Sequence, residues 1–298
     1  MDHRLFCFGL GYSAEVLVRT LLAEGWQVAG TAREPERLAQ LQALGVEAYP
    51  FGRRHPLPEG ALRGTTHLLS SVPPDAEGDA VLAGCSAAIL AEAEHLRWLG
   101  YLSTTGVYGD YRGAWVDETS PLRPTSERAW RRVSAEAGWL DFNRLQHLPV
   151  AVFRLAGIYG PGRSALDDLR AGTAKRVVKR GQVFSRIHVE DIAGVLRASM
   201  AQPPQGGAIY NVCDDEAAKP QDVIAFAAEL LGIAPPPESA FEDAELSPMA
   251  QTFWTDNKRV RNDRIKSELG VALRYPTYRE GLAGLLESPS PEIGRGPG

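Results

Sequence analysis

Short, almost continuously apolar runs alternate along the chain with longer stretches in which apolar residues recur at helical spacing. The first run covers residues 5–8, and the stretch that follows, 13–24, places Leu17 and Leu21 on one face before Gly25. Runs of this kind are typical of strands buried on both faces, and the helical stretches between them supply the covering layers. The pattern therefore predicts an α/β fold with a doubly wound parallel sheet.

The predicted strands cover residues 5–8, 27–31, 46–49, 66–70, 101–104, 150–154 and 209–212. The predicted helices cover residues 13–24, 34–44, 80–96, 126–146, 191–200 and 221–231. We expect residues 1–165 to form the core and residues 166–287 to complete it and add a smaller C-terminal lobe. Residues 288–298 are rich in Pro and Gly and are expected to be disordered.

The chain has 298 residues, of which 44% are hydrophobic and 23% charged, as is ordinary for a globular protein. It has 32 basic against 37 acidic residues, a net charge of −5, and no long basic run, which argues against nucleic acids and anionic membranes as partners. No signal peptide or membrane span is recognisable, so we expect a cytoplasmic protein. Cys7, Cys85 and Cys213 are predicted to be small buried hydrophobes, and the scattered His and Cys residues do not support a metal site.

A glycine motif, Gly-Leu-Gly-Tyr-Ser-Ala at residues 9–14, follows the first predicted strand and opens the first predicted helix. Gly9 permits a tight turn, Gly11 lets the backbone approach a pyrophosphate, and the helix N-terminus faces the anion. The motif predicts a Rossmann-type dinucleotide site, and the alternative is a glycine turn in another kind of α/β protein. The cofactor-binding residues predicted from it are Gly9, Gly11, Tyr12, Ser13 and Ala14.

The residues after the second predicted strand indicate which dinucleotide is bound. An NAD-binding chain usually has Asp or Glu there, whereas this chain has Thr31 and Arg33, which offer a hydroxyl and a guanidinium to a 2′-phosphate. One charged contact of this kind is worth about ten- to a hundredfold in affinity. We therefore expect NADP(H) to be favoured over NAD(H). The alternative is that Arg33 is solvated at the start of the next helix, where Glu34 and Arg37 are charged as well.

Several later segments occur in an order that is typical of one superfamily. Residues 102–109 read Leu-Ser-Thr-Thr-Gly-Val-Tyr-Gly, residues 154–162 read Arg-Leu-Ala-Gly-Ile-Tyr-Gly-Pro-Gly, and residues 187–192 read Ile-His-Val-Glu-Asp-Ile. Over nearly its whole length the chain resembles the extended short-chain dehydrogenase/reductase superfamily of the NAD-dependent epimerase/dehydratase type. The resemblance implies a Rossmann-type fold whose small C-terminal lobe binds the substrate.

In that superfamily a Ser/Thr, a Tyr and a Lys carry the proton transfer that accompanies hydride transfer, and the Tyr and Lys are spaced Y-x-x-x-K. Thr104 matches the Ser/Thr position, but Arg128 and Arg132 stand at the four-residue spacing of the other two. Arginine stays protonated near neutral pH and cannot exchange the proton. Either another group supplies the proton or the usual redox step is lost.

Tyr108, Tyr111 and His188 are the candidate substitutes, and we predict Thr104 and Tyr108 as the catalytic residues. A structural role is the alternative for Tyr108 and for His188. Because ligands bind at the carboxyl ends of parallel strands, the crevice is expected to be lined by Ser70, Ser71, Thr104 and Tyr108, with the two serines contacting the cofactor.

Arginines supply the evidence on the substrate. Members that act on nucleotide sugars often carry an arginine in an R-D-F/Y run before the I-H-V segment, and here Arg186 is displaced from that position, which makes a nucleotide sugar doubtful. Arg128, Arg132 and Arg186 are predicted to contact a small, possibly anionic, substrate, and Arg154 and Arg163 keep such a substrate plausible. For Arg128 and Arg132, a solvated helix face is an equal alternative.

Two function classes follow. The first is an NADP(H)-dependent oxidoreductase or epimerase-like enzyme with a non-standard proton donor, for which Thr104 matters to turnover. The second is a non-catalytic NADP(H)-binding sensor or scaffold, which binds oxidised and reduced cofactor unequally. The resemblance also implies a possible homodimer through the helix at residues 126–146, although core packing explains its apolar stripe equally well.

Overall fold

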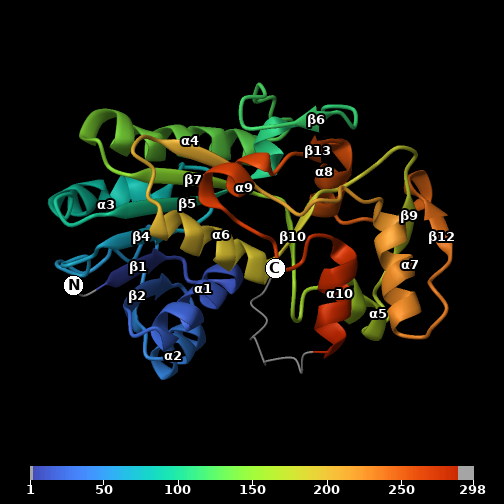
Figure 1. Cartoon of the computed structure of the whole chain (residues 1–298), viewed down its shortest axis with the longest axis horizontal. Helices are drawn as coiled ribbons and strands as arrows, with labels where there is room; N and C mark the ends of the chain where they lie inside the picture. The colour runs from blue at the N-terminus through green and yellow to red at the C-terminus, as the bar shows by residue number, and fades with distance from the viewer. Residues whose placement is uncertain (1–2, 288–298) are drawn as a thin grey trace.

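A parallel sheet of seven strands forms the centre of the computed structural model, which describes residues 3–287 apart from the side chains of residues 248–250 (Figure 1). The strands lie in the order β11-β7-β5-β4-β1-β2-β3. Their bounds are β1 Arg4–Phe8, β2 Gln27–Ala32, β3 Glu47–Pro50, β4 His67–Ser70, β5 Trp98–Thr104, β7 Val150–Leu155 and β11 Ala208–Val212. The strand order reverses between β1 and β4, so the crevice at their carboxyl ends is the expected ligand site of a fold of this type.

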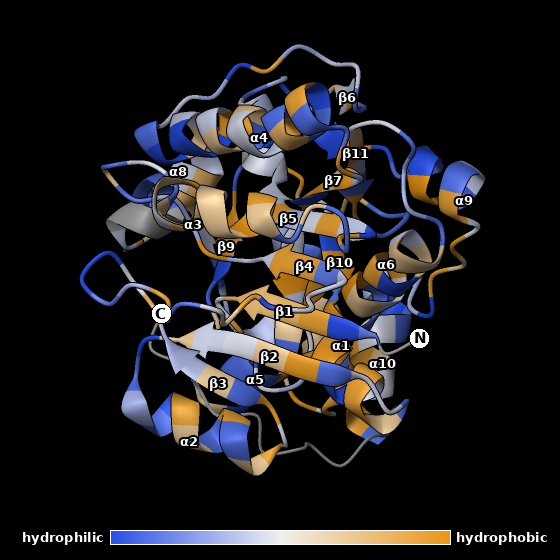
Figure 2. Cartoon of the chain, turned by 90° about the vertical axis from the view of Figure 1, so that its left-hand side faces the viewer, coloured by the Kyte–Doolittle hydropathy of each residue, from blue (hydrophilic) through white to orange (hydrophobic). Residues whose placement is uncertain are grey.

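Helices cover both faces of this sheet (Figure 1). On one face lie α1 Tyr12–Ala23, α2 Pro35–Ala43 and α6 Val189–Ala201, and on the other lie α3 Ala80–Ala91 and α4 Glu127–Gln146. Each face has its own apolar cluster, one containing Leu17 and Ile192, the other Cys85 and Trp139. Figure 2 shows that β1 and β4 between these layers are mostly hydrophobic. The predicted doubly wound α/β fold is confirmed.

A smaller lobe lies beside the sheet, on the right in Figure 1. It consists of α5 Ala165–Arg170, α7 Pro220–Leu230, α10 Tyr278–Glu287 and two strand pairs, β8 Gly157–Tyr159 with β10 Arg186–His188 and β9 Arg176–Val178 with β12 Glu238–Ala240. A third apolar cluster, which includes Leu166, Val223 and Leu282, forms its core. The remaining elements are η1 Thr105–Tyr108, β6 Trp115–Val116, η2 Phe241–Asp243, α8 Pro248–Thr255, β13 Arg259–Val260 and α9 Asp263–Leu269, with β6 paired to β13.

Two predicted boundaries are wrong. The helix expected to reach residue 96 ends at Ala91, because the N–H groups of Glu92 and Ala93 turn back to the carbonyls of Ile89 and Leu90. The strand expected at residues 101–104 begins earlier, at Trp98, which pairs with His67 of β4 and is fully buried. The tail at residues 288–298, expected to be disordered, lies outside the described residues.

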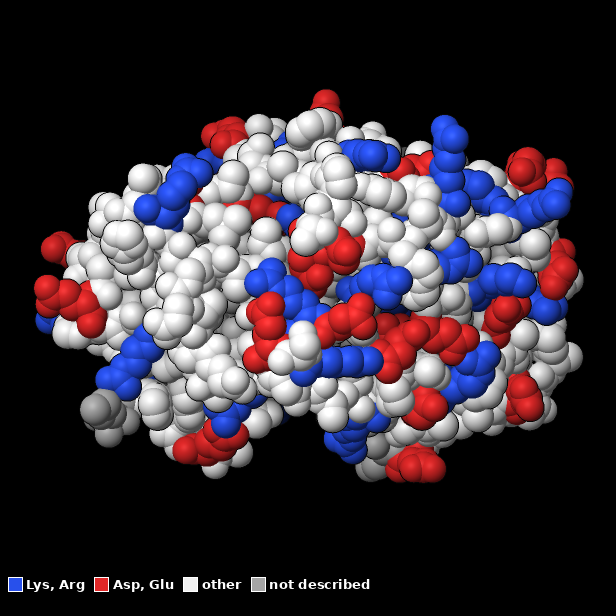
Figure 3. Space-filling view, turned by 45° about the horizontal axis from the view of Figure 1, so that its top comes forward, with Lys and Arg blue, Asp and Glu red and all other residues white. Residues whose placement is uncertain are grey.

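Within residues 3–287, no helix is both long enough and apolar enough to span a bilayer. Cys7, Cys85 and Cys213 are free and buried, as predicted. In the same part of the chain, no group of three or more His, Cys, Asp and Glu side chains is arranged to hold a metal ion. On the face drawn in Figure 3, acidic and basic side chains are interspersed, and they gather over the half that holds the smaller lobe.

Candidate functional site

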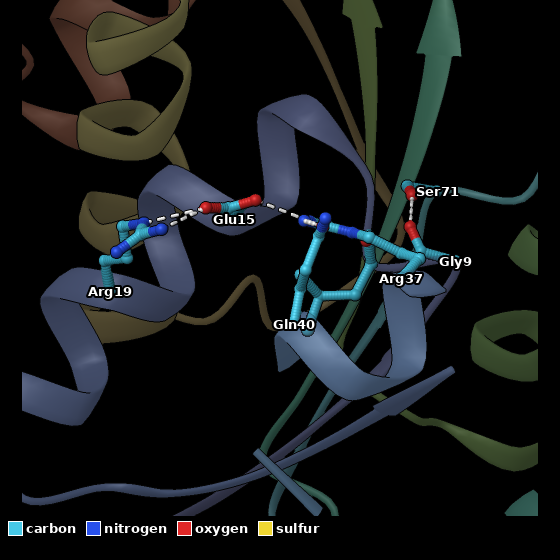
Figure 4. Close-up of polar contacts among 7 residues, drawn as sticks. Gly9, Glu15, Arg19, Arg37, Gln40 and Ser71 are labelled. Atoms are coloured by element: carbon cyan, nitrogen blue, oxygen red, sulfur yellow. Dashed lines mark hydrogen bonds and ion pairs between the residues drawn. The ribbon is translucent and has the colours of Figure 1, made fainter. Parts of the chain in front are cut away.

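The glycine turn, residues 9–14, joins β1 to α1 at the reversal point of the sheet. Gly9 has a φ of +73°, and a Cβ atom at this position would lie 2.9 Å from Cγ2 of Val72. The N–H of Gly9 donates to Oγ1 of Thr31 at 2.8 Å, and the hydroxyl of Ser71 donates to the Gly9 carbonyl (Figure 4). The turn is therefore held from the ends of β2 and β4, and only glycine fits at position 9.

The N-terminus of α1 has no side-chain cap. Its N-cap residue is Gly11, whereas α3 and α4 are capped by the side chains of Asp79 and Ser126, which accept hydrogen bonds from first-turn N–H groups. The first N–H groups of a helix have no intrahelical acceptor, so those of α1, including Tyr12 and Ser13, are left for an anion. This arrangement suits the pyrophosphate of a dinucleotide.

The polar residues predicted around the turn divide into two groups. Thr31 is 1% exposed and Ser70 is fully buried, so they do not offer their hydroxyls to a ligand. The expected direct contact of Thr31 with a 2′-phosphate is therefore corrected, because its hydroxyl accepts from Gly9 and shapes the turn instead. Ser71 is half-buried beside Gly9, and Arg33 is exposed just after β2.

An ion cluster flanks the turn (Figure 4). Glu15, in the first turn of α1, is paired on one side with Arg19 and on the other with Arg37 of α2, each at 2.5 Å. Burial alone would raise the pKa of Glu15, but the hydrogen bonds from Arg37 and Arg19 outweigh it and hold the pKa below its ordinary value. Glu15 is therefore ionised at neutral pH, and its charge is compensated beside the uncapped helix end.

Thr104 ends β5 at the same edge of the sheet. It is half-buried and caps η1 by accepting a hydrogen bond from the N–H of Gly106 at 3.1 Å. Arg132 donates to the carbonyl of Leu102 at 2.7 Å and to the hydroxyl of Tyr101, while Arg128, one turn earlier on α4, is exposed. Arg132 is thus engaged by the backbone of β5, and neither arginine lines the cavity described below.

Tyr108 is fully buried in a polar network behind this edge. Its hydroxyl donates to Oδ1 of Asn211 at 2.7 Å and accepts from Arg154 at 2.9 Å, and Arg154 forms a buried ion pair with Glu136 at 2.7 Å. Burial raises the pKa of Tyr108 to about 12 although Arg154 opposes the rise. The expectation that Tyr108 lines the crevice is corrected, and its placement favours the structural role left open by the sequence.

The other two candidate proton donors are His188, whose ring is buried, and Tyr111, whose hydroxyl is hydrogen-bonded. His188 is 1% exposed between the rings of Tyr159 and Tyr275, and burial lowers its pKa to about 4, so it is neutral at physiological pH. Tyr111 is half-buried and donates its hydroxyl proton to the carbonyl of Pro121 at 2.6 Å. For His188 the geometry favours the structural alternative.

Lys258 is a titratable residue that the sequence analysis did not single out. Its Nζ donates to the carbonyl of Gly109 at 2.9 Å, directly after η1, and lies 3.5 Å from the carboxylate of Asp256. Its side chain is 11% exposed, and burial lowers its pKa below the ordinary lysine value although Asp256 opposes the shift. No local motif marks this lysine, because 149 positions separate it from Gly109 in the chain.

A cavity of about 420 Å³ opens in the smaller lobe between α5, α7 and α10. Its wall includes the cations Arg163, Lys175 and Arg186 and one carboxylate, that of Asp168. Arg186 is the one residue among the three predicted substrate arginines that lines it. Cations outnumber acids in the wall, so the cavity is suited to an anion.

The cavity adjoins the glycine turn through the loop at residues 160–163. The hydroxyl of Tyr12 donates to the carbonyl of Pro161 at 3.1 Å, and the guanidinium of Arg163 lies 6.0 Å from the centre of the Tyr12 ring. Behind the cavity, the N–H of Asp214 donates to the carbonyl of Arg186 at 2.7 Å. Burial raises the pKa of Asp214 to about 8, against the lowering effect of the Glu216 N–H and of Arg186.

The chain is similar to several known proteins in sequence and in structure. Residues 81–213 match the sequence profile of the NAD dependent epimerase/dehydratase family. The solved structure of a functionally unknown conserved protein from Silicibacter pomeroyi DSS is 54% identical, with a TM-score of 0.88 over 96% of this chain and 99% of that one. Protein YeeZ of Escherichia coli (strain K12) is 28% identical over 90% of this chain and 94% of its own length. A 3-diazoavenalumate denitrifying reductase from Streptomyces sp is 27% identical over 91% of this chain and 96% of its own length.

Proposed function

The chain belongs to the NAD-dependent epimerase/dehydratase type of the extended short-chain dehydrogenase/reductase superfamily, and from this premise we propose that it is an NADP(H)-dependent oxidoreductase or epimerase-like enzyme acting on an anionic small molecule. The uncapped N-terminus of α1 behind the Gly9 turn carries the proposal. Free N–H groups and a backbone without Cβ atoms fit a pyrophosphate.

NADP(H) is the proposed cofactor rather than NAD(H). The residue exposed directly after β2 is Arg33, and a guanidinium there favours a ribose 2′-phosphate, whereas an NAD site usually has a carboxylate to accept from the 2′-OH. Glu34, the next residue, is the N-cap of α2. When bound, the cofactor supplies or accepts a hydride.

The anionic group of the substrate is proposed to bind in the cavity of the smaller lobe, with the rest of the molecule reaching towards Thr104 and Lys258, which do not line that cavity. Arg163, Lys175 and Arg186 supply positive charge from three different segments, which favours a carboxylate or phosphate ester over a neutral molecule. The loop at residues 160–163 links this cavity to the glycine turn through Tyr12, so ligands in the two places would lie side by side.

Lys258 is the proposed proton donor in place of the usual tyrosine. Burial lowers the pKa of Lys258 below the ordinary lysine value, and unlike Arg128 and Arg132 a lysine can give up and take back a proton. Lys258 contacts Gly109, at the end of the segment that Thr104 begins, and the Thr104 hydroxyl is proposed to orient the substrate. In the direction of reduction, activity should then fall as pH rises through the pKa of Lys258, because the donor must be protonated.

The test is consumption of NADPH, followed by the absorbance of the reduced nicotinamide, against a panel of carboxylated and phosphorylated aldehydes and ketones. We expect turnover with at least one of them and a loss of about 10²–10⁴ in kcat for Lys258→Met. Lys175→Met, which removes a cavity cation, should raise KM and leave the pH profile unchanged. Turnover by Lys258→Met at the wild-type rate and with the wild-type pH profile would exclude Lys258 as the donor.

A non-catalytic NADP(H) sensor is the second candidate, favoured by the two arginines at the Y-x-x-x-K spacing. It predicts no turnover with any member of the panel, unequal affinities for NADP⁺ and NADPH, and no effect of Thr104→Val on either affinity. Binding of both forms measured on wild type and Thr104→Val separates the two functions.

A further inference from the structure

Arg37 lies against the glycine turn (Figure 4). From α2 it donates through Nε and Nη2 to the carbonyl of Leu10, at 3.4 and 3.2 Å, and through Nη2 to Glu15 at 2.5 Å. A third contact, from Nη1 to Oε1 of Gln40, measures 3.2 Å. These contacts fix the guanidinium in one orientation beside the turn.

The contacts do not use up the donors of Arg37. A guanidinium has five N–H groups, and the four hydrogen bonds leave one on Nη1 for a ligand. The charge is not fully neutralised either, because Glu15 is shared between Arg37 and Arg19, so two cations face one carboxylate. The Arg37 side chain is 22% exposed and that of Glu15 only 3%, so the surplus positive charge faces solvent.

The position of Arg37 corresponds to the ribose end of a dinucleotide. Leu10 is the second residue of the glycine turn, and its N–H donates to the carbonyl of Thr31 near the end of β2 at 2.8 Å. In doubly wound folds the adenosine ribose lies between the glycine turn and the end of the second strand. Arg33, at the end of that strand, is exposed, and no hydrogen bond or ion pair to another residue in 3–287 is seen for it.

We propose that Arg37 contacts a phosphomonoester on the ribose 2′-oxygen alongside Arg33 and contributes more to the specificity than Arg33 does, and that Glu15 is the positioning residue that holds Arg37 there. This inference rests on the proposed NADP(H) function and adds to it the group that distinguishes the two dinucleotides. A cation held in place loses less conformational freedom on binding than the unrestrained Arg33 does.

The test compares the affinity of full-length protein for adenosine 2′,5′-bisphosphate and for adenosine 5′-monophosphate, which differ only in the 2′-phosphate. In Arg37→Gln, we expect the preference for the bisphosphate to fall about ten- to a hundredfold, while affinity for the monophosphate changes less than about threefold. Arg19→Gln is the matched control, since it also removes one partner of Glu15 but on the other side of the carboxylate, and its preference should stay at the wild-type value.

Equal loss of preference in both variants, or an unchanged preference in Arg37→Gln, would overturn the inference. Should Arg37→Gln not fold because Glu15 has lost a partner, the double variant Glu15→Gln/Arg37→Gln removes both charges and takes its place; its preference for the bisphosphate should fall as far, and an unchanged preference would overturn the inference. The proposed function fails in a different way: a wild-type protein that binds neither nucleotide, or binds both equally, contradicts NADP(H) preference whatever the variants do.

Discussion

The glycine turn and the cavity of the smaller lobe are both suited to negative charge, but they are built differently. At the turn the donors are backbone N–H groups, set by Gly9 and by the start of α1, with Arg37 fixed beside them. In the cavity the positive charge comes from side chains on separate segments, among them Arg163 and Arg186. A binding site formed by backbone atoms has no room for an added side-chain atom, whereas long side chains that line a cavity can change their conformation after a substitution. The two should therefore respond differently to substitution.

The largest effect is expected at Gly9. In Gly9→Ala the new Cβ would meet Val72 in a backbone conformation that L-residues rarely adopt, so the turn must shift and cofactor affinity should fall at least about a hundredfold. Gly25→Ala is the control, because Gly25 has a φ of +82° but nothing within 4 Å of its Cβ position. Calorimetric titration of both variants with NADPH measures the difference, and equal affinities would show that the turn does not hold the cofactor.

A large effect on stability is expected in the polar network behind the edge. Glu136→Ala leaves the buried guanidinium of Arg154 without its carboxylate and should lower the free energy of unfolding by about 3–5 kcal/mol. The exposed pair of Glu127 and Arg131 offers a control, for which Glu127→Ala should cost less than about 1 kcal/mol. Denaturant titration gives both values, and similar losses would mean that burial of the first pair does not matter.

A pH-dependent effect on stability is expected behind the cavity, at Asp214. Its pKa is raised to about 8 in the folded state from 3.8, so the folded protein keeps a proton that the unfolded chain loses across this range. Asp214 therefore contributes stability that is present below about pH 4 and is lost as pH rises towards 8. Asp214→Asn has no carboxyl to titrate, so its stability relative to wild type should rise between pH 4 and pH 8. Thermal unfolding at the two pH values checks this, and a difference that does not change with pH would contradict it.

The cofactor end was largely predictable because its signals are local. Each strand of the central sheet lies within a few residues of its predicted position. The glycine motif correctly predicted which residues form the turn between β1 and α1. Thr31 and Ser70 lie at the predicted carboxyl edge of the sheet, but their side chains are buried, whereas contact with the cofactor requires exposed ones. The sequence pattern shows which strand a residue belongs to, but not how deeply its side chain is buried. From the sequence, Arg37 could be recognised only as a charged residue of a predicted helix, and its contacts with Leu10 and Glu15 could not be predicted.

The substrate end was less predictable because it depends on contacts between distant segments. Lys258 meets Gly109 through a loop that no motif marks, and Tyr108 is buried by Arg154 and Asn211 from two other strands. The strands β6, β8, β9, β10, β12 and β13 have only two or three residues, too few for alternation to be recognised.

The most direct test of the account is a calorimetric titration of purified, cofactor-free protein with NADPH and, separately, with NADH. We expect NADPH to bind and NADH to bind at least about tenfold more weakly, because one charged contact is lost with the 2′-phosphate. Binding of neither cofactor, or tighter binding of NADH, would contradict it.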